Sequence, residues 1–191
     1  MRGARWVHLT GITPALSGSA RAAVDSAIDQ ARQAGATVSF DVNLRRRLWS
    51  ADVAAPVLGA LARRADIVLG SPDELELVAG GPDGPARLLD DGVALVVTKA
   101  GLEGARSIDG AGRAIAVPAF PVQASVDPVG AGDAFCAGFI AARLRGHENE
   151  LALTWGAACG AAVAAVAGDI DGLPTSDELS RILERGPDTT R

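Results

Sequence analysis

The sequence predicts an α/β fold in which a mostly parallel sheet is flanked by helices. Short strand candidates alternate with helical patterns through the first hundred residues, as βαβ units require. Leu95–Thr98 is apolar enough to predict a strand buried on both faces, which is typical of parallel sheets. With 191 residues, 48% of them hydrophobic and 4% aromatic, the chain is expected to form one domain over residues 1–185, with a frayed tail at 186–191.

The first half of the chain is predicted to contain alternating strands and helices. A helix is expected to begin at Ser17 or Ser19, both good N-caps, and to end at Gly35. Another helix starts at Ser71, where a proline and two acids follow in the first turn. Further helices are predicted at about 52–64 and 84–91. The predicted strands are Trp6–Leu9, Ala36–Phe40, Asp66–Leu69 and Leu95–Thr98.

The second half is predicted to contain a hairpin and then helices. Two short strands, Arg106–Ile108 and Ala114–Val117, flank the turn sequence Asp109–Gly112. Two long helices follow at 131–145 and 149–167. A Gly-Leu-Pro break then precedes a last short helix that begins at Ser176.

Charge and cysteine usage exclude several classes of function. The net charge of −5 argues against a nucleic-acid or anionic-membrane surface, and Arg45–Arg47 is too short a basic run to reverse that. Cys136 and Cys159 lie in apolar helical patterns and are expected to be small buried hydrophobes in a reducing compartment. No cysteine or histidine spacing suggests a metal cluster. No signal segment is seen and the longest apolar stretch is rich in Gly and Ala, so we expect a soluble cytoplasmic protein.

The run Asp127–Asp133 carries the strongest chemical signal. Its glycines precede a helical pattern, so backbone N–H groups and the helix dipole can form an anion site. Asp133 falls near the first helical turn, where it can take a proton from a hydroxyl that attacks a bound phosphate. One alternative is a plain helix cap. A dinucleotide-binding turn is the other, but that fingerprint expects flanking strands, and an Ala-rich helix follows here instead.

The fourteen residues DPVGAGDAFCAGFI, from Asp127 to Ile140, resemble the C-terminal signature of the PfkB/ribokinase family of carbohydrate kinases. The resemblance implies a ribokinase-like, Rossmann-like fold and the use of ATP with Mg²⁺. It implies that the amides of Gly130, Ala131 and Gly132 hold the transferred phosphoryl group. It also implies that Asp133 is the catalytic base.

A second candidate segment follows the strand that ends at Phe40. The spacing of Asp41, Asn43 and Arg45 predicts an extended segment with all three on one side, and Arg45 can bind a carboxylate or phosphate in bidentate fashion. A turn in which Asp and Asn bond their own backbone is an equal alternative. The wording FDVNLRRRLW resembles 2-keto-3-deoxygluconate kinases and fructokinases, which implies that Arg45 reaches a sugar acid while Asp41 and Asn43 shape the site.

Two further segments are expected near the nucleotide. Ser71 and Glu74 occupy a pattern that in the family lies near magnesium and the phosphates, with serine in place of the common asparagine. Lys99, the only lysine of the chain, precedes a turn similar to the family's GxxG turn, which implies nucleotide contacts for Gly101 and Gly104. The alternatives are a helix start for Ser71–Glu74 and a solvent-facing strand end for Lys99. Ala157 stands where the family often has Asn, so the small residues around it are taken as close helix packing.

The resemblance runs from about Trp6 to Leu179 and covers only the C-terminal part of the family pattern. The early strands, the lid and most sugar contacts have no match, so a fragment or a natural truncation is expected. Two hypotheses remain. The first is an ATP-dependent sugar or sugar-acid kinase, most like 2-keto-3-deoxygluconate kinase, with a fructokinase or ribokinase type as its alternative. The second is a truncated, non-catalytic nucleotide-binding module that needs a partner. The expected partners are ATP and a small sugar, with a homo-oligomer or a missing N-terminal part.

Overall fold

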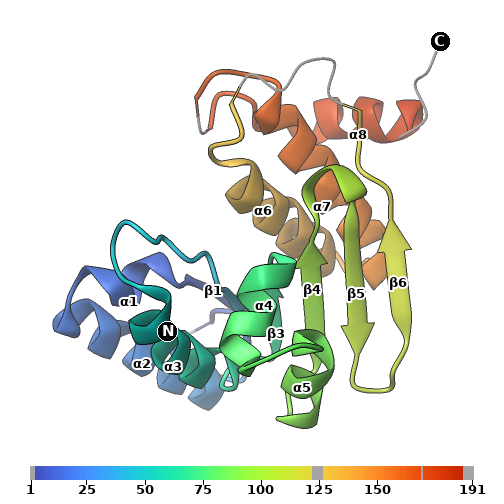
Figure 1. The fold of residues 1–191 in the computed structure, drawn as a ribbon. Helices are drawn as coiled ribbons and strands as arrows, with labels where there is room; N and C mark the ends of the chain where they lie inside the picture. Colours follow the sequence, from blue (N-terminus) through green and yellow to red (C-terminus); the bar gives the residue numbers. More distant parts are fainter. Residues whose placement is uncertain (1–2, 122–126, 169, 187–191) are drawn as a thin grey trace. The chain divides into compact units, whose positions relative to one another are not determined.

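The computed structural model describes residues 3–121, 127–168 and 170–186 and confirms the α/β class (Figure 1). Six strands form one sheet in the order β1-β2-β3-β4-β5-β6. Neighbours among the first four strands run parallel, with Val7 opposite Val38, Phe40 opposite Val68, and Val68 opposite Val96. The strands are β1 (Trp6–Thr10), β2 (Thr37–Asp41), β3 (Ile67–Gly70), β4 (Leu95–Lys99), β5 (Ala105–Asp109) and β6 (Ala114–Val117).

The helices match the predicted order, with two additions, α1 and the 3₁₀ turn η1. The short helix α1 follows β1 directly and was not expected from the sequence. The predicted hairpin is confirmed, since Asp109 N–H donates to Arg113 O at 3.2 Å between β5 and β6. The helices are α1 (Ile12–Leu16), α2 (Gly18–Gln33), α3 (Ala51–Ala62), α4 (Pro72–Ala79), α5 (Gly84–Asp90), the 3₁₀ turn η1 (Gly101–Glu103), α6 (Ala131–Leu144), α7 (Asn149–Ala164) and α8 (Ser176–Arg185).

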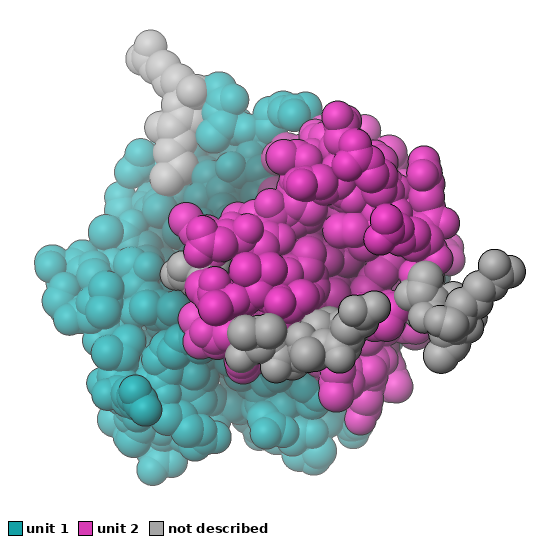
Figure 2. All heavy atoms as spheres, turned by 90° about the horizontal axis from the view of Figure 1, so that it is seen from above, with its two compact units in different colours: residues 1–98, 108–114 teal, residues 99–107, 115–191 magenta. Residues whose placement is uncertain are grey.

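The chain divides into two compact units, coloured separately in Figure 2. The first unit comprises residues 1–98 and 108–114, and the second comprises residues 99–107 and 115–191. The division falls at the end of β4, between Thr98 and Lys99, and again within β5 after Ser107 and within β6 after Ala114. The assignment of residues 1–185 to one domain stays a prediction, and the predicted frayed tail lies, except for Gly186, outside the described residues.

The first unit folds around β2 and β3. Val38, Phe40 and Val68 are fully buried, as expected for strands of a parallel sheet covered on both faces. Helix α2 starts where the sequence predicts, because the Ser17 side chain accepts from Ala20 N–H at 3.0 Å. The carboxylate of Asp66 accepts from Val38 N–H at 2.7 Å, which fixes the turn into β3 against β2.

The second unit is built on the close packing of α6 against α7. A Cβ added to Gly138 would lie 2.7 Å from Trp155 O, and one added to Gly156 would lie 3.0 Å from Phe135. Larger residues at these positions would force the helices apart. The prediction that the small residues around Ala157 serve helix packing is therefore confirmed. Cys159 is buried in this interface, and burial raises the pKa of its thiol to about 11.

Candidate phosphate and sugar sites

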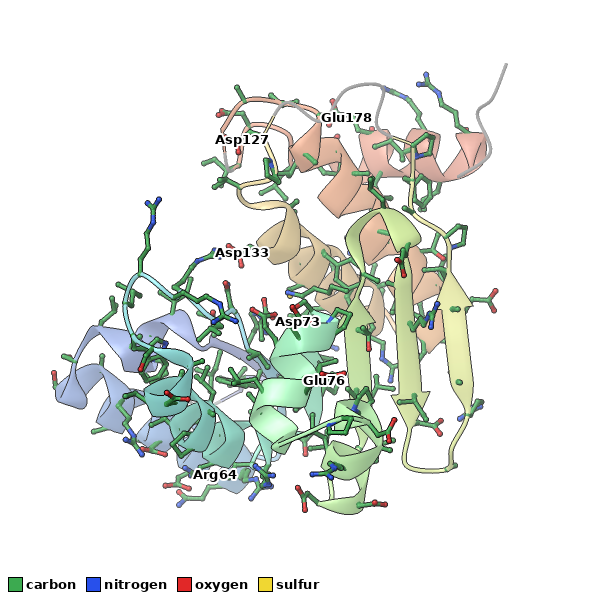
Figure 3. All side chains as sticks on the ribbon, viewed as in Figure 1. Arg64, Asp73, Glu76, Asp127, Asp133 and Glu178 are labelled. Carbon is green, nitrogen blue, oxygen red and sulfur yellow. The ribbon has the colours of Figure 1, made fainter. Side chains whose placement is uncertain are left out.

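The N-terminus of α6 lies in the second unit and presents Asp133. Gly130 is the N-cap residue in a left-handed conformation, with φ at 79° and ψ at −17°, and its carbonyl accepts from Ala134 N–H at 2.8 Å. Asp133 falls in the first turn of α6 with an exposed side chain. Figure 3 labels it at that end of the helix. The first N–H groups of a helix have no intrahelical partner and attract anions, so this end of α6 has the geometry of an anion site with a carboxylate beside it.

The loop before α6 is shaped by Asp127, which Figure 3 also labels. The Asp127 carboxylate accepts from Val129 N–H at 3.0 Å, so the chain makes a tight Asx turn. Ala131 N–H donates to Pro128 O at 3.3 Å, a long hydrogen bond for which a bound anion would compete. The loop therefore leads into Gly130 through a compact turn, and this turn favours a residue that tolerates a positive φ at position 130.

Lys99 approaches the same helix end from the end of β4. A Cβ built on Gly132 would lie 3.5 Å from Lys99 Nζ, and the ammonium donates to Cys136 Sγ at 3.8 Å. The lysine is half-buried, so the alternative of a solvent-facing strand end does not describe it. This placement adds a positive charge to the first turns of α6. Cys136 was not predicted as a neighbour of this site, although its spacing of three residues from Asp133 indicates the same helix face.

Gly130 is the glycine of the phosphate loop that adopts an unusual backbone. Gly132 lies two positions later, within the first turn of α6. Its backbone is that of an ordinary helical residue, because the positive φ belongs to Gly130. A side chain at Gly132 would meet Lys99 only at ordinary contact distance. The requirement for glycine is therefore conformational at Gly130.

Gly101 and Gly104 border the turn after β4 and differ in what surrounds them. Both have positive φ, 57° at Gly101 and 90° at Gly104. A Cβ on Gly104 would lie 2.1 Å from Val117 O, so packing of the turn against β6 alone demands glycine there. A Cβ on Gly101 would meet nothing within 4 Å. The backbone of Gly101 is thus open on the side that a Cβ would occupy.

The candidate sugar-side residues lie in the first unit, in the segment after β2. Asp41 and Asn43 are buried, 1% and 7% exposed, whereas Arg45 is exposed. The predicted extended segment is wrong, because Asn43 has φ of 38° and interrupts the alternation that would place the three side chains on one side. The alternative, a turn in which Asp41 and Asn43 bond their own backbone, stays a prediction, and the turn that the structure describes begins at Arg45. Arg45 O accepts from Leu48 N–H at 2.8 Å.

Ser71 and Glu74 form a capping box at the start of α4. Ser71 Oγ accepts from Glu74 N–H at 3.3 Å, and Glu74 Oε2 accepts from Ser71 N–H at 2.8 Å. The helix-start alternative is thus confirmed as part of their role. Glu74 makes one contact that its sequence position does not indicate: its Oε1 accepts from Leu44 N–H at 2.8 Å. Asp73, labelled in Figure 3, lies beside it in the first turn and is exposed.

The candidate residues therefore fall into two groups, one in each unit. Asp41, Asn43, Arg45, Ser71 and Glu74 belong to the first unit, and Lys99, Gly101, Gly104 and Gly130–Asp133 belong to the second. The described part of the chain contains no group of three or more His, Cys, Asp or Glu side chains able to hold a metal ion. Mg²⁺ commonly keeps several waters and binds through substrate phosphates with one or two carboxylates, so these residues fit a metal that arrives with ATP.

Comparison with known proteins identifies the class of protein to which this geometry corresponds. The family model described as pfkB family carbohydrate kinase matches residues 3–176. The chain therefore belongs to the pfkB family of carbohydrate kinases. Within the described residues, no helix has both the length and the apolar character needed to cross a membrane.

The similar curated proteins act on sugar acids by name. The chain is 38% identical over 182 residues to 2-dehydro-3-deoxygluconokinase of Bacillus subtilis, covering 93% of this chain and 56% of that protein. It is 34% identical over 184 residues to 2-dehydro-3-deoxygalactonokinase of Haloferax volcanii, covering 94% of this chain and 57% of that protein. The chain thus spans a little over half the length of the curated relatives that it matches.

Solved structures show the same fold. A PfkB protein from Polaromonas sp. JS666 is 38% identical with a TM-score of 0.79, covering 92% of this chain and 56% of its own. A Vibrio cholerae fructokinase, solved with fructose, ADP and potassium, is 29% identical with a TM-score of 0.86, covering 96% of this chain and 61% of its own. A putative ribokinase II from E. coli, solved with ATP and Mg²⁺, is 28% identical with a TM-score of 0.86, covering 95% of this chain and 59% of its own.

Proposed function

We propose that this chain provides the phosphoryl-transfer site of an ATP-dependent kinase that phosphorylates a hydroxyl of a sugar acid of the 2-keto-3-deoxygluconate type. The proposal rests on the arrangement of residues at the N-terminus of α6. Gly130 turns the chain into the helix, Asp133 lies in its first turn, and Lys99 Nζ lies 3.5 Å from the position of a Gly132 Cβ. Amides, helix dipole and ammonium together favour a polyanion such as a triphosphate.

The proposed roles follow from these positions. The Asp133 carboxylate takes the proton of the attacking hydroxyl as the new oxygen–phosphorus bond forms and the bond to the leaving ADP breaks. The amides of Gly130, Ala131 and Gly132 stabilise the charge on the transferred group. Lys99 binds phosphate, and the open backbone at Gly101, with Gly104 behind it, borders the nucleotide. ATP supplies the phosphoryl group, and Mg²⁺ neutralises its charge.

The sugar side of the proposal rests on Arg45. Its guanidinium is exposed on a turn after a buried strand, and a planar fork of donors suits a carboxylate bound in bidentate fashion. Asp41 and Asn43 shape the base of that turn. The names of the curated relatives support a sugar acid as substrate. Ser71 and Glu74 are assigned to the Mg²⁺ and phosphate side, since each Glu74 oxygen keeps a second lone pair beside its backbone contact.

The test measures sugar-dependent ADP release with 2-keto-3-deoxygluconate, fructose and ribose, together with nucleotide binding by calorimetry. Asp133→Asn should lower turnover by about 10²–10⁴-fold because the general base is lost. Nucleotide affinity and melting temperature should stay near those of the wild type. Turnover within a few-fold of wild type in the variant would contradict the assignment of the base.

A second candidate is a non-catalytic nucleotide-binding module. It is favoured by the anion-site geometry of the α6 N-terminus, which nucleotide binding alone would also use. The same experiment separates the two. Nucleotide binding by the 191-residue chain without turnover of any sugar supports the module. Turnover supports the kinase, and absence of nucleotide binding contradicts both.

A further inference from the structure

We infer that Glu74 is a positioning residue that fixes the turn carrying Arg45, in addition to any role near the metal. The consequence for sugar-acid binding rests on the proposed function, whereas the contacts of Glu74 do not depend on it. Both Glu74 oxygens accept backbone N–H groups at 2.8 Å, from Ser71 within its own capping box and from Leu44, thirty positions earlier in the chain. Glu74 therefore ties the start of α4 to the residue that immediately precedes Arg45.

The cap alone does not explain this arrangement. A capping box needs one carboxylate oxygen for the N-cap N–H, and Oε2 supplies it. The second oxygen, Oε1, accepts from Leu44 N–H in the segment after β2, and this bond does not cap helix α4. A backbone N–H that bonds a carboxylate is held more strongly than one that bonds a neutral acceptor. The contact thus serves the segment after β2.

The segment after β2 needs such a contact because its backbone is unfavourable. Asn43 has φ of 38°, a conformation that residues other than glycine rarely adopt and that persists where neighbouring contacts impose it. Contacts flank it on both sides. Val42 N–H donates to Leu69 O at 2.9 Å before it, and Leu44 N–H donates to Glu74 after it. Arg45 is the next residue, so its starting direction is set by the Leu44 anchor.

The consequence is a specificity role for a side chain that need not touch the sugar. An arginine that binds a carboxylate in bidentate fashion must present its planar group in one orientation. A loosened turn would spread that orientation over many rotamers and weaken sugar-acid binding. Lys99 and Gly130–Asp133, proposed to bind the nucleotide phosphates, belong to the second unit and lie outside the turn that would be loosened.

The first measurement needs neither substrate nor nucleotide. Amide hydrogen exchange is followed by NMR in the 191-residue chain and in Glu74→Gln, with Asp73→Asn as the matched control. Asp73 is exposed, neighbours Glu74 in the same helical turn and loses the same charge. Glutamine keeps the shape of glutamate, but one of the two acceptor oxygens is replaced by an NH₂ group, which donates and cannot accept, so at least one of the two backbone N–H groups loses its acceptor. Exchange of the Leu44 amide, the Ser71 amide or both should accelerate about 10-fold to 100-fold in Glu74→Gln, and within twofold in Asp73→Asn.

The second measurement separates the sugar side from the metal side. In Glu74→Gln the KM for 2-keto-3-deoxygluconate should rise at least about 10-fold, and any accompanying change in the KM for ATP or in the Mg²⁺ dependence reports the separate metal-side role proposed for Glu74. Unchanged exchange at both amides overturns the inference. A shift confined to ATP and Mg²⁺ also overturns it and leaves Glu74 only its metal-side role. The exchange experiment decides the inference even where no sugar is turned over, so its failure is distinct from failure of the proposed kinase.

Discussion

Replacing Gly130 with alanine should destabilise the protein, whereas the same change at Gly132 should not. The two glycines are two positions apart at the start of α6, and a sequence reading gives them similar weight. Gly130 has φ of 79° and Gly132 has helical geometry. A Cβ in the left-handed region costs about 1–2 kcal/mol, while alanine within a helix is about 0.5–1 kcal/mol more favourable than glycine. The expected changes in the free energy of unfolding therefore have opposite signs.

The surroundings of Gly132 keep this prediction simple. The added methyl group would lie 3.5 Å from Lys99 Nζ, which is ordinary van der Waals contact with the end of a flexible side chain. No steric cost offsets the gain in helix propensity. For a chain of this length, 1 kcal/mol corresponds to about 2–4 °C in melting temperature. Gly130→Ala should thus melt about 2–8 °C lower than the wild type, and Gly132→Ala should melt at the same temperature or slightly higher.

The assay is thermal and urea unfolding of the three proteins, followed by circular dichroism under identical conditions. Urea midpoints should show the same order as melting temperatures, with equal m-values if the denatured state is unaffected. Equal destabilisation by both variants would refute the reasoning, because it would mean that the positive φ at Gly130 has no energetic consequence. Destabilisation by Gly132→Ala alone would refute the assignment of backbone geometry to the two positions.

Two further predictions concern side chains in the second unit. Lys99→Ala should raise the dissociation constant for ATP by about 10-fold, and Lys99→Arg should restore only part of the lost affinity, because the wider guanidinium must fit where the ammonium approaches Gly132 and Cys136. Calorimetry with both variants tests this. Affinities equal to that of the wild type would mean that Lys99 has only a structural role. Cys159 should react with a thiol reagent at pH 8 at least about 100-fold more slowly than a free cysteine, because its pKa of about 11 leaves little thiolate. Peptide mass spectrometry measures the labelling. Reaction of Cys159 in the folded protein at the rate of a free thiol would contradict its burial between α6 and α7.

Much of the fold followed from local patterns. The alternation of apolar segments with helical periodicity predicted β1 to β4, and good caps predicted the starts of α2 and α4. These signals work because each depends on neighbours within a few positions. Helix α1 was missed because Ile12–Leu16 is too short to show a period and carries a proline inside it.

The candidate site was less accessible from sequence, since its details depend on distant contacts. Spacing suggested an extended segment at Asp41–Arg45, yet Asn43 has a positive φ and lies between two tertiary hydrogen bonds, one to Leu69 in β3 and one to Glu74 in α4. The bond between Leu44 and Glu74 joins residues thirty positions apart, and no local pattern encodes it. The contact of Lys99 with the first turns of α6 has the same origin. Only the spacing of Cys136 from Asp133 offered a signal that could have been used.

The division of candidate residues between the two units makes each half of the proposal separately testable. Lys99 and Gly130–Asp133, proposed for phosphate, belong to the second unit, whereas the first unit holds the residues proposed for the sugar acid together with Ser71 and Glu74, proposed for the Mg²⁺ and phosphate side. A change such as Gly130→Ala therefore acts on local contacts of one group, and Glu74→Gln on those of the other. A double-mutant cycle between Glu74 and Lys99 measures the coupling of the two groups. If the double variant Glu74→Gln, Lys99→Ala lowers ATP affinity no more than Lys99→Ala alone, Glu74 does not contribute to nucleotide binding, and its anchoring of Leu44 accounts for its place in the site.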